Sequence, residues 1–219
     1  MSQAPNPSDP HAGMQHLRVG PELASAKGMM ILVHGRGGDA NDMLGLLPYL
    51  DAEDLHVVAL QAAGNSWYPF PFMSPTGQNE PGRTSGLDLI HRSVTEAEAA
   101  GLRTSKVVLG GFSQGACLAL EYVHTNRRKY GAVLGFSGGL IGPPGTVFGG
   151  ADALDGTPVF LGCSDRDPHI PRERVAETAA ALSAGGATVD ERIYPAMGHT
   201  INADELSAAW ELVQRVTTE

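Results

Sequence analysis

The pentapeptide GFSQG, residues 111–115, places Ser113 between two glycines directly after the apolar run KVVLGG. A serine hydroxyl is a weak nucleophile unless an adjacent base accepts its proton. In a Gly-x-Ser-x-Gly turn between a strand and a helix, the turn exposes the hydroxyl and the glycines allow close backbone packing. The apolar segment QGACLALEYV follows the serine, which fits this context. Ser113 is therefore a candidate nucleophile, with an ordinary turn serine as the alternative.

His199 is the candidate base, because YPAMGHTI places it between a predicted strand at 188–194 and a predicted helix at 201–217. His169 is the alternative, but it lies only two residues from the carboxylate favoured below, and a base and its orienting group normally come from separate loops. His34 ends a strand and is expected to hold the loop that follows. The other histidines have no motif around them and are expected at the surface or in packing: His11, His16, His56, His91 and His124.

The segment GCSDRDPHIP offers two carboxylates, Asp165 and Asp167, directly after an apolar run. Such a carboxylate orients the imidazole of the base and stabilises its charged form. Asp167 is favoured because Pro168 restricts it to extended backbone, which suits a loop leaving a strand. Asp165 is then expected to cap or brace the loop. The resulting chain order, serine, then acid, then histidine, is the order of the α/β-hydrolases.

Donors for a developing oxyanion are the remaining requirement of an acyl-transfer site. The first candidate is the backbone N–H of Gln114, the residue after the serine. The second is the backbone N–H of Arg36 in HGRGG, residues 34–38, whose glycines allow amides to point at a ligand. The alternative for HGRGG is a phosphate loop, but it lacks the Lys-Ser/Thr ending of a P-loop and the spacing of a dinucleotide fingerprint. The side chain of Arg36 could reach solvent or a substrate carboxylate.

The elements that must position these residues alternate along the chain. Short runs rich in Val, Leu and Ile are predicted as strands buried on both faces: 28–34, 56–60, 106–112, 131–136 and 158–162. The segment 188–194 alternates more and is expected near a sheet edge, and 14–19 is expected as an antiparallel edge strand. This alternation with helices predicts an α/β fold, with a mostly parallel central sheet, helices on both faces and no separate lid domain.

The helices between these strands show apolar residues at spacings of three and four. They are predicted at four ranges: 84–100, 113–127, 171–184 and 201–217. The last of them is expected to bury one stripe: Leu206, Ala209, Trp210, Val213 and Val216.

The longest irregular stretch is the loop 61–83, and structureless loops of this length are usually functional or mobile. Its aromatic residues are candidates for an acyl pocket or a partial cover: Trp67, Tyr68, Phe70 and Phe72. Met73 and Leu140 are further pocket candidates. The alternative is that the aromatic side chains anchor the loop to the core. Without a lid insertion, the site is expected to be open to small, soluble esters.

Composition limits the organisation of the chain and its partners. The 219 residues fit one domain, predicted at 14–219 after a flexible leader at 1–13. The net charge of -9 argues against nucleic acid as the partner, and the absence of a long apolar run argues against membrane insertion. The N-terminus lacks the pattern of a secretory signal, and Cys117 and Cys163 are expected as buried free thiols, which favours a cytoplasmic protein. A homodimer is compatible with the sequence but is not derivable from it.

The chain resembles the bacterial phospholipase/carboxylesterase family, small α/β-hydrolases related to acyl-protein thioesterases. The matching blocks run from about residue 28 onward: ILVHGRGGDANDM, NSWYPFPFMSP, NEPGRTSGL, GGFSQGA, FSGGL, SDRDPHIP and YPAMGHTI. The resemblance implies a triad of Ser113, Asp167 and His199, oxyanion amides from Arg36 and Gln114, and no metal or organic cofactor. The chain departs from the acyl-protein thioesterases at HGRGG, where those enzymes usually carry HGLGD.

Together these features predict a serine carboxylesterase that acts on small-molecule esters through an acyl-enzyme intermediate, and the resemblance implies short to medium acyl chains. The first alternative is an acyl thioesterase or a lysophospholipase with the same triad. An alternative of a different class is a non-catalytic ligand receptor on the hydrolase fold, because a fold does not guarantee an activity.

Overall fold

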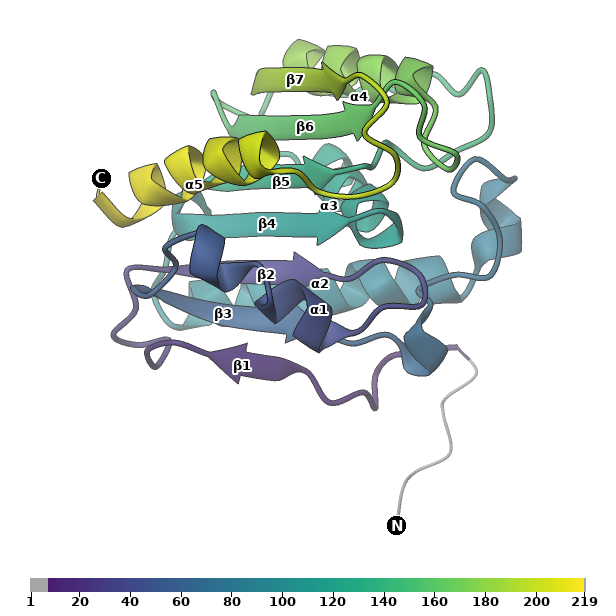
Figure 1. Ribbon diagram of the computed structural model, residues 1–219. Coiled ribbons are helices and arrows are strands. Elements are labelled where there is room, and N and C mark those ends of the chain that lie inside the picture. The colour runs from purple at the N-terminus through teal and green to yellow at the C-terminus, as the bar shows by residue number, and fades with distance from the viewer. Residues whose placement is uncertain (1–7, 219) are drawn as a thin grey trace.

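The computed structural model describes residues 8–218, and a seven-stranded sheet runs through its centre in the order β1-β3-β2-β4-β5-β6-β7 (Figure 1). The strands are β1 (Leu17–Val19), β2 (Gly28–Val33), β3 (Leu55–Leu60), β4 (Val107–Phe112), β5 (Ala132–Phe136), β6 (Pro158–Ser164) and β7 (Thr188–Tyr194). Strand β1 pairs antiparallel with β3, and the other neighbouring pairs run parallel. The predicted edge positions of β1 and β7 are therefore confirmed.

Helices cover both faces of the sheet (Figure 1). Helices α1 (Ala40–Leu44) and α5 (Ala203–Thr218) lie on one face, and α2 (Gly82–Ala99), α3 (Gln114–Thr125) and α4 (Arg172–Ala184) lie on the other. Short 3-10 helices occupy Leu47–Tyr49, Ala63–Asn65, Thr76–Asn79 and Thr104–Lys106. Consecutive residues of β2 alternate between the two cores, since Ile31 belongs to the core under α2, α3 and α4 and Leu32 belongs to the core under α1 and α5. Because both faces of the central strands are buried, these strands are continuous apolar runs in the sequence.

Parallel pairing brings four chain segments to one edge of the sheet. The carboxyl ends of β2, β4, β6 and β7 lead directly into the segments that carry Arg36, Ser113, Asp167 and His199. In open parallel sheets, ligands bind beyond the carboxyl ends of the strands. The residues selected by type and spacing therefore share the edge at which chemistry is expected.

Helix α1 is an element that the periodicity does not predict, because five residues are too few to show a repeat. The signal in the sequence is its cap. The Asp39 side chain accepts hydrogen bonds from the backbone N–H groups of Asn41 (2.8 Å) and Asp42 (3.2 Å), which begins the helix directly after HGRGG.

The buried stripe predicted for α5 is wrong at one position. Trp210 is 43% exposed, whereas Ala208 and Ala209 are buried against the sheet. Small side chains allow the helix backbone to lie close to β5 and β6, so the bulky indole falls at the margin of the contact. Glu205 is also fully buried on this helix, which an apolar stripe does not predict.

The flexible leader predicted at 1–13 lies outside the described residues as far as residue 7. The following residues lie against α2: Asp9 accepts hydrogen bonds from Ser85 (2.5 Å) and Arg92 (3.3 Å), and His11 is 2% exposed. The ring of His11 bonds to the carbonyl of Trp67 at 3.0 Å. Asp9 and His11 therefore contact the domain, although the predicted boundary at residue 13 places them in the leader.

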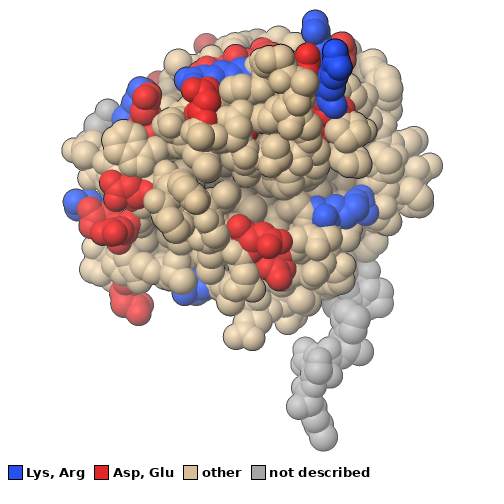
Figure 2. Space-filling model, viewed as in Figure 1, with Lys and Arg blue, Asp and Glu red and all other residues tan. Residues whose placement is uncertain are grey.

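The surface carries charges of both signs. Figure 2 shows acidic and basic side chains in small groups on one face, with wide uncharged areas between them. Of the helices within residues 8–218, none combines the length and apolarity that a bilayer crossing requires. Cys117 and Cys163 are both buried and free, as predicted.

Candidate active site

The turn at Ser113 has a left-handed backbone, with φ 54° and ψ -118°. Its N–H donates to the Phe136 carbonyl at 2.9 Å, which ties the turn to the neighbouring strand. A Cβ at Gly111 would collide with the backbone of α3, and one at Gly115 would collide with the Val33 carbonyl. Both flanking glycines are therefore needed for α3 to pass so close to β2 and β4.

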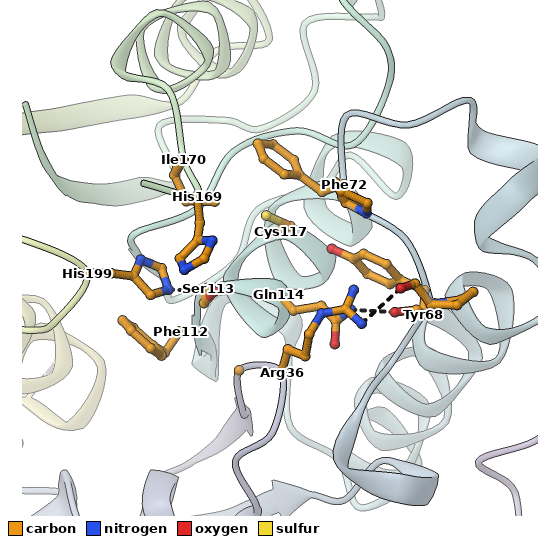
Figure 3. A pocket seen from close by; sticks show the side chains of 13 residues that line it. Arg36, Tyr68, Phe72, Phe112, Ser113, Gln114, Cys117, His169, Ile170 and His199 are labelled. Atoms are coloured by element: carbon orange, nitrogen blue, oxygen red, sulfur yellow. Dashed lines mark hydrogen bonds between the residues drawn. The ribbon is translucent and has the colours of Figure 1, made fainter. Parts of the chain in front are cut away.

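Three side chains from separate loops meet at this turn. The Ser113 hydroxyl lies 2.8 Å from Nε2 of His199, and Nδ1 of His199 lies 2.7 Å from Oδ2 of Asp167. The first of these contacts is drawn in Figure 3. A carboxylate at Nδ1 favours the tautomer in which Nδ1 carries the proton and Nε2 is free to accept one from the serine.

The carboxylate of Asp167 is fixed by the chain that follows it. Its Oδ1 accepts hydrogen bonds from the backbone N–H groups of His169 (2.8 Å) and Ile170 (3.0 Å). Burial opposes ionisation of this carboxyl, but the hydrogen bonds from His199 and from these two amides outweigh it and lower the pKa of Asp167. Asp167 therefore stays anionic opposite the imidazole.

The imidazole of His199 is packed between two rings. The ring centroid of Phe112 lies 4.8 Å away on one side, and that of His169 lies 4.8 Å away in an edge-on arrangement. The loop that carries His199 is tied to the loop that carries Asp167, since the Ala196 N–H donates to the Asp165 carboxylate at 2.7 Å. Asp165 thus braces the loop, as the sequence analysis expects.

Arg36 and Gln114, whose backbone N–H groups are the expected oxyanion donors, line one cavity with Ser113, and Figure 3 shows the two residues next to each other. Gln114 is the first residue of α3, and the first N–H groups of a helix have no partner within it. The loop after β2 is held by His34, whose Nε2 accepts the N–H of Ala62 at 3.1 Å. This bond gives His34 the loop-holding role expected from its place in the sequence.

The side chains of Arg36 and Gln114 hold the loop 61–83, which we call the aromatic loop. The guanidinium of Arg36 donates to the Pro69 and Phe70 carbonyls, both at 3.0 Å, so it serves this loop rather than extending freely into solvent. The Gln114 amide accepts the Trp67 N–H and donates to the Tyr68 carbonyl, both at 2.8 Å. Part of the loop 61–83 is therefore fastened directly to the turn that carries Ser113.

The cavity beside Ser113 has a volume of about 540 Å³. Of the pocket candidates, Tyr68 and Phe72 line it. Trp67 does not, because it is fully buried and its indole N–H donates to the His34 carbonyl at 2.8 Å. It anchors the loop, which is the alternative that the sequence left open.

The remaining pocket candidates also lie away from the cavity wall. Phe70 is 48% exposed, Leu140 is buried in the core, and Met73 is partly buried against that core. Several lining residues are instead new: Phe112, Cys117, His169 and Ile170, with Gly35, Pro69 and Pro71. Most of them lie close in sequence to Ser113, Asp167 or Arg36, and Pro69 and Pro71 lie beside the aromatic residues of the loop 61–83, which is the signal that could have found them.

The described residues contain no group of three or more His, Cys, Asp or Glu side chains arranged to hold a metal ion.

This sheet, with a serine at a strand-to-helix turn and the acid and histidine on later loops, defines an α/β-hydrolase. The model of the family described as Phospholipase/Carboxylesterase matches residues 14–217, and the chain belongs to this family. It is a carboxylic ester hydrolase.

Similar proteins carry related names. The chain is 39% identical to a phospholipase/carboxylesterase from Dyadobacter fermentans, with a TM-score of 0.87 over 91% of this chain and 96% of that one. It is 27% identical to acyl-protein thioesterase 1 of Saccharomyces cerevisiae, over 88% of this chain and 94% of the yeast protein. The Bacillus cereus carboxylesterase, 18% identical with a TM-score of 0.72 over 94% of this chain and 95% of that one, shares the fold.

Proposed function

We propose that the chain is a serine carboxylesterase that hydrolyses short- to medium-chain esters of small molecules, with Ser113 as nucleophile, His199 as base and Asp167 as its orienting acid. The observation that carries the proposal is the continuous series of contacts from the serine hydroxyl through the imidazole to the carboxylate, at 2.8 and 2.7 Å. Hydroxyl activation requires this geometry.

The reaction runs in two halves. His199 accepts the proton of Ser113 as the hydroxyl oxygen attacks the ester carbonyl, and the imidazolium then gives that proton to the departing alcohol. Water enters, loses a proton to His199 and attacks the acyl-enzyme, which releases the acid and restores the serine. Asp167 stabilises the imidazolium in both halves without taking its proton.

The developing oxyanion is assigned to the backbone N–H groups of Arg36 and Gln114. These donors are fixed before substrate binds, because the first belongs to a loop held by hydrogen bonds of His34 and of the Arg36 side chain, and the second to the start of α3. Removing one such donor typically lowers turnover about 100- to 1000-fold.

The size of the cavity supports short to medium acyl chains. Its volume of about 540 Å³ lies in the range of small-molecule sites, and Phe72 and Ile170 provide apolar contacts. Within residues 8–218 no separate lid domain covers the opening.

Turnover of p-nitrophenyl butyrate by Ser113→Ala tests the proposal. We expect kcat to fall by about five to six orders of magnitude with an unchanged melting temperature. Near-normal turnover by the purified, folded variant would remove Ser113 from the mechanism. Stoichiometric labelling by a fluorophosphonate without turnover of any ester would favour the ligand receptor instead.

A thioesterase is the second candidate, because a similar protein in yeast is named acyl-protein thioesterase 1. The same triad would serve either leaving group. A panel of matched oxygen esters and thioesters, with acyl chains from two to sixteen carbons and a lysophospholipid included, separates the candidates. A higher kcat/KM on long-chain thioesters or on the lysophospholipid would replace the proposed substrate class.

A further inference from the structure

Tyr68 carries a polar group that the triad does not use. Its side chain is 2% exposed and lines the same cavity as Ser113, and its hydroxyl has no hydrogen-bond partner among the residues that the structure describes. Figure 3 shows this hydroxyl pointing from the aromatic loop toward the part of the cavity beside Cys117. Buried hydroxyls are nearly always paired, so an unpaired one aimed into a substrate cavity indicates a partner on the ligand.

The protein groups around the hydroxyl do not replace such a partner. The Cys117 thiol interacts with the hydroxyl, but burial raises the pKa of this thiol to about 12, so it stays neutral and is only a weak hydrogen-bonding partner. Phe72 and Ile170 make neighbouring parts of the wall apolar. Burial also raises the pKa of Tyr68 well above its usual value, so its hydroxyl remains a donor.

The ring of Tyr68 is positioned before substrate arrives. The Tyr68 carbonyl accepts hydrogen bonds from the Gln114 amide at 2.8 Å and from the Ser66 hydroxyl at 3.1 Å. The preceding residue, Trp67, is anchored in the core through its indole N–H. Polar groups held this rigidly discriminate between ligands, because they cannot move to find another partner.

The position of the hydroxyl indicates which part of the substrate it meets. His199 gives its proton to the leaving alcohol, so the alcohol lies on the His199 side of Ser113. Figure 3 shows Tyr68 on the opposite side, beyond Gln114. The acyl chain therefore extends toward Tyr68. Cys117 follows Ser113 by one turn of α3, since its N–H donates to the Ser113 carbonyl, and one turn spans about 5.4 Å.

We propose that the Tyr68 hydroxyl is a specificity-determining donor for an oxygen atom on the acyl chain, placed a few bonds beyond the scissile carbonyl. The inference rests on the proposed esterase function and names its substrate class: esters of short acids that carry an ether, hydroxyl or carbonyl oxygen. An acyl chain made only of methylenes leaves the hydroxyl buried against carbon, which disfavours that substrate.

Two substrates of equal length test the inference. In p-nitrophenyl 3-methoxypropanoate an ether oxygen replaces one methylene of p-nitrophenyl pentanoate. The measured quantity is the ratio of kcat/KM for the ether ester to that for the pentanoate, in the wild type and in Tyr68→Phe. The ratio cancels the fraction of folded enzyme, and comparing two enzymes cancels the intrinsic reactivity of the esters.

We expect the ratio to fall about tenfold in Tyr68→Phe. The matched control is Tyr130→Phe, which removes another buried hydroxyl, one that donates to the Asn126 carbonyl at 2.7 Å away from the cavity. This control should keep the wild-type ratio. Equal ratios in the wild type and Tyr68→Phe would overturn the inference.

Failure of the inference and failure of the function are distinguishable. If the wild type hydrolyses both esters, Ser113→Ala hydrolyses neither and the ratio does not respond to Tyr68, the esterase stands and the inference falls. If the wild type turns over no ester, the proposed function falls, and the inference falls with it.

Discussion

Replacing Asp167 by Asn changes one atom and should disable the triad. The carboxylate receives two backbone N–H groups at Oδ1 and the imidazole of His199 at Oδ2. The amide of Asn must keep its oxygen toward the two N–H donors, which turns its NH2 toward Nδ1 of His199. Two donors cannot share that contact, so the imidazole adopts the tautomer with its proton on Nε2. In that form it cannot accept the proton of Ser113.

The magnitude follows from this change of tautomer. An Asp-to-Asn change in the equivalent role of a serine protease lowers kcat about 10⁴-fold, and at 1.36 kcal/mol per factor of ten this raises the barrier by about 5 kcal/mol. We expect a loss of this size in kcat for p-nitrophenyl acetate, with little change in KM. The assay is steady-state hydrolysis, combined with thermal unfolding to show that the variant is folded.

Asp165→Asn is the matched control for this prediction. Asp165 is exposed and accepts the Ala196 N–H, and an amide oxygen can still accept it. We expect its turnover to stay within about twofold of the wild type. A larger loss for Asp165→Asn than for Asp167→Asn would refute the assignment of the acid and the tautomer argument with it.

Three further substitutions test other parts of the structure. Burial raises the pKa of Glu205 to about 7, so its neutral carboxyl contributes fully to the free energy of unfolding below pH 4.5, and this contribution is lost as pH rises through 7. Between pH 5 and pH 8 the free energy of unfolding, measured with urea, should therefore fall by up to about 3 kcal/mol. Glu205→Gln should remove most of this pH-dependent fall. Arg36→Ala removes the bonds that hold the aromatic loop but keeps the backbone donor, so KM for p-nitrophenyl butyrate should rise about tenfold with a smaller change in kcat, and an unchanged KM would contradict this role. Gly115→Ala forces a methyl group against the carbonyls of Val33 and His34 at the end of β2 and should lower the free energy of unfolding by about 1–3 kcal/mol. Gly77→Ala, with open space around the added methyl group, should leave it unchanged.

The sequence predicts the sheet well and selects three side chains that the structure brings together, because the signals of both are local. Doubly buried strands such as Gly28–Val33 are continuous apolar runs, and parallel pairing then brings their carboxyl ends to one edge. The turn at Ser113 is marked by the glycines that its close packing requires. Asp167 is marked by the proline after it, and the order of the loops leaves His199 as the base.

The pocket is harder to predict because it depends on how one loop is held. Trp67 and Tyr68 are adjacent aromatic residues, yet the first is buried under the loop and the second faces the cavity. Hydrogen bonds from Arg36 and Gln114 fix the register of this loop, and these residues lie far from it in sequence. The exposure of Trp210 has a similar origin, because the way α5 packs on the sheet decides which of its apolar side chains the contact covers.

The central claim is that the hydroxyl of Ser113 is the group that becomes acylated, and covalent labelling tests it most directly. The wild type is treated with a fluorophosphonate, and the modified residue is located by peptide mass spectrometry. We expect one adduct per chain, on Ser113, formed much more slowly in Asp167→Asn. An adduct at another residue, or an enzyme that hydrolyses esters yet stays unmodified at Ser113, would contradict the account.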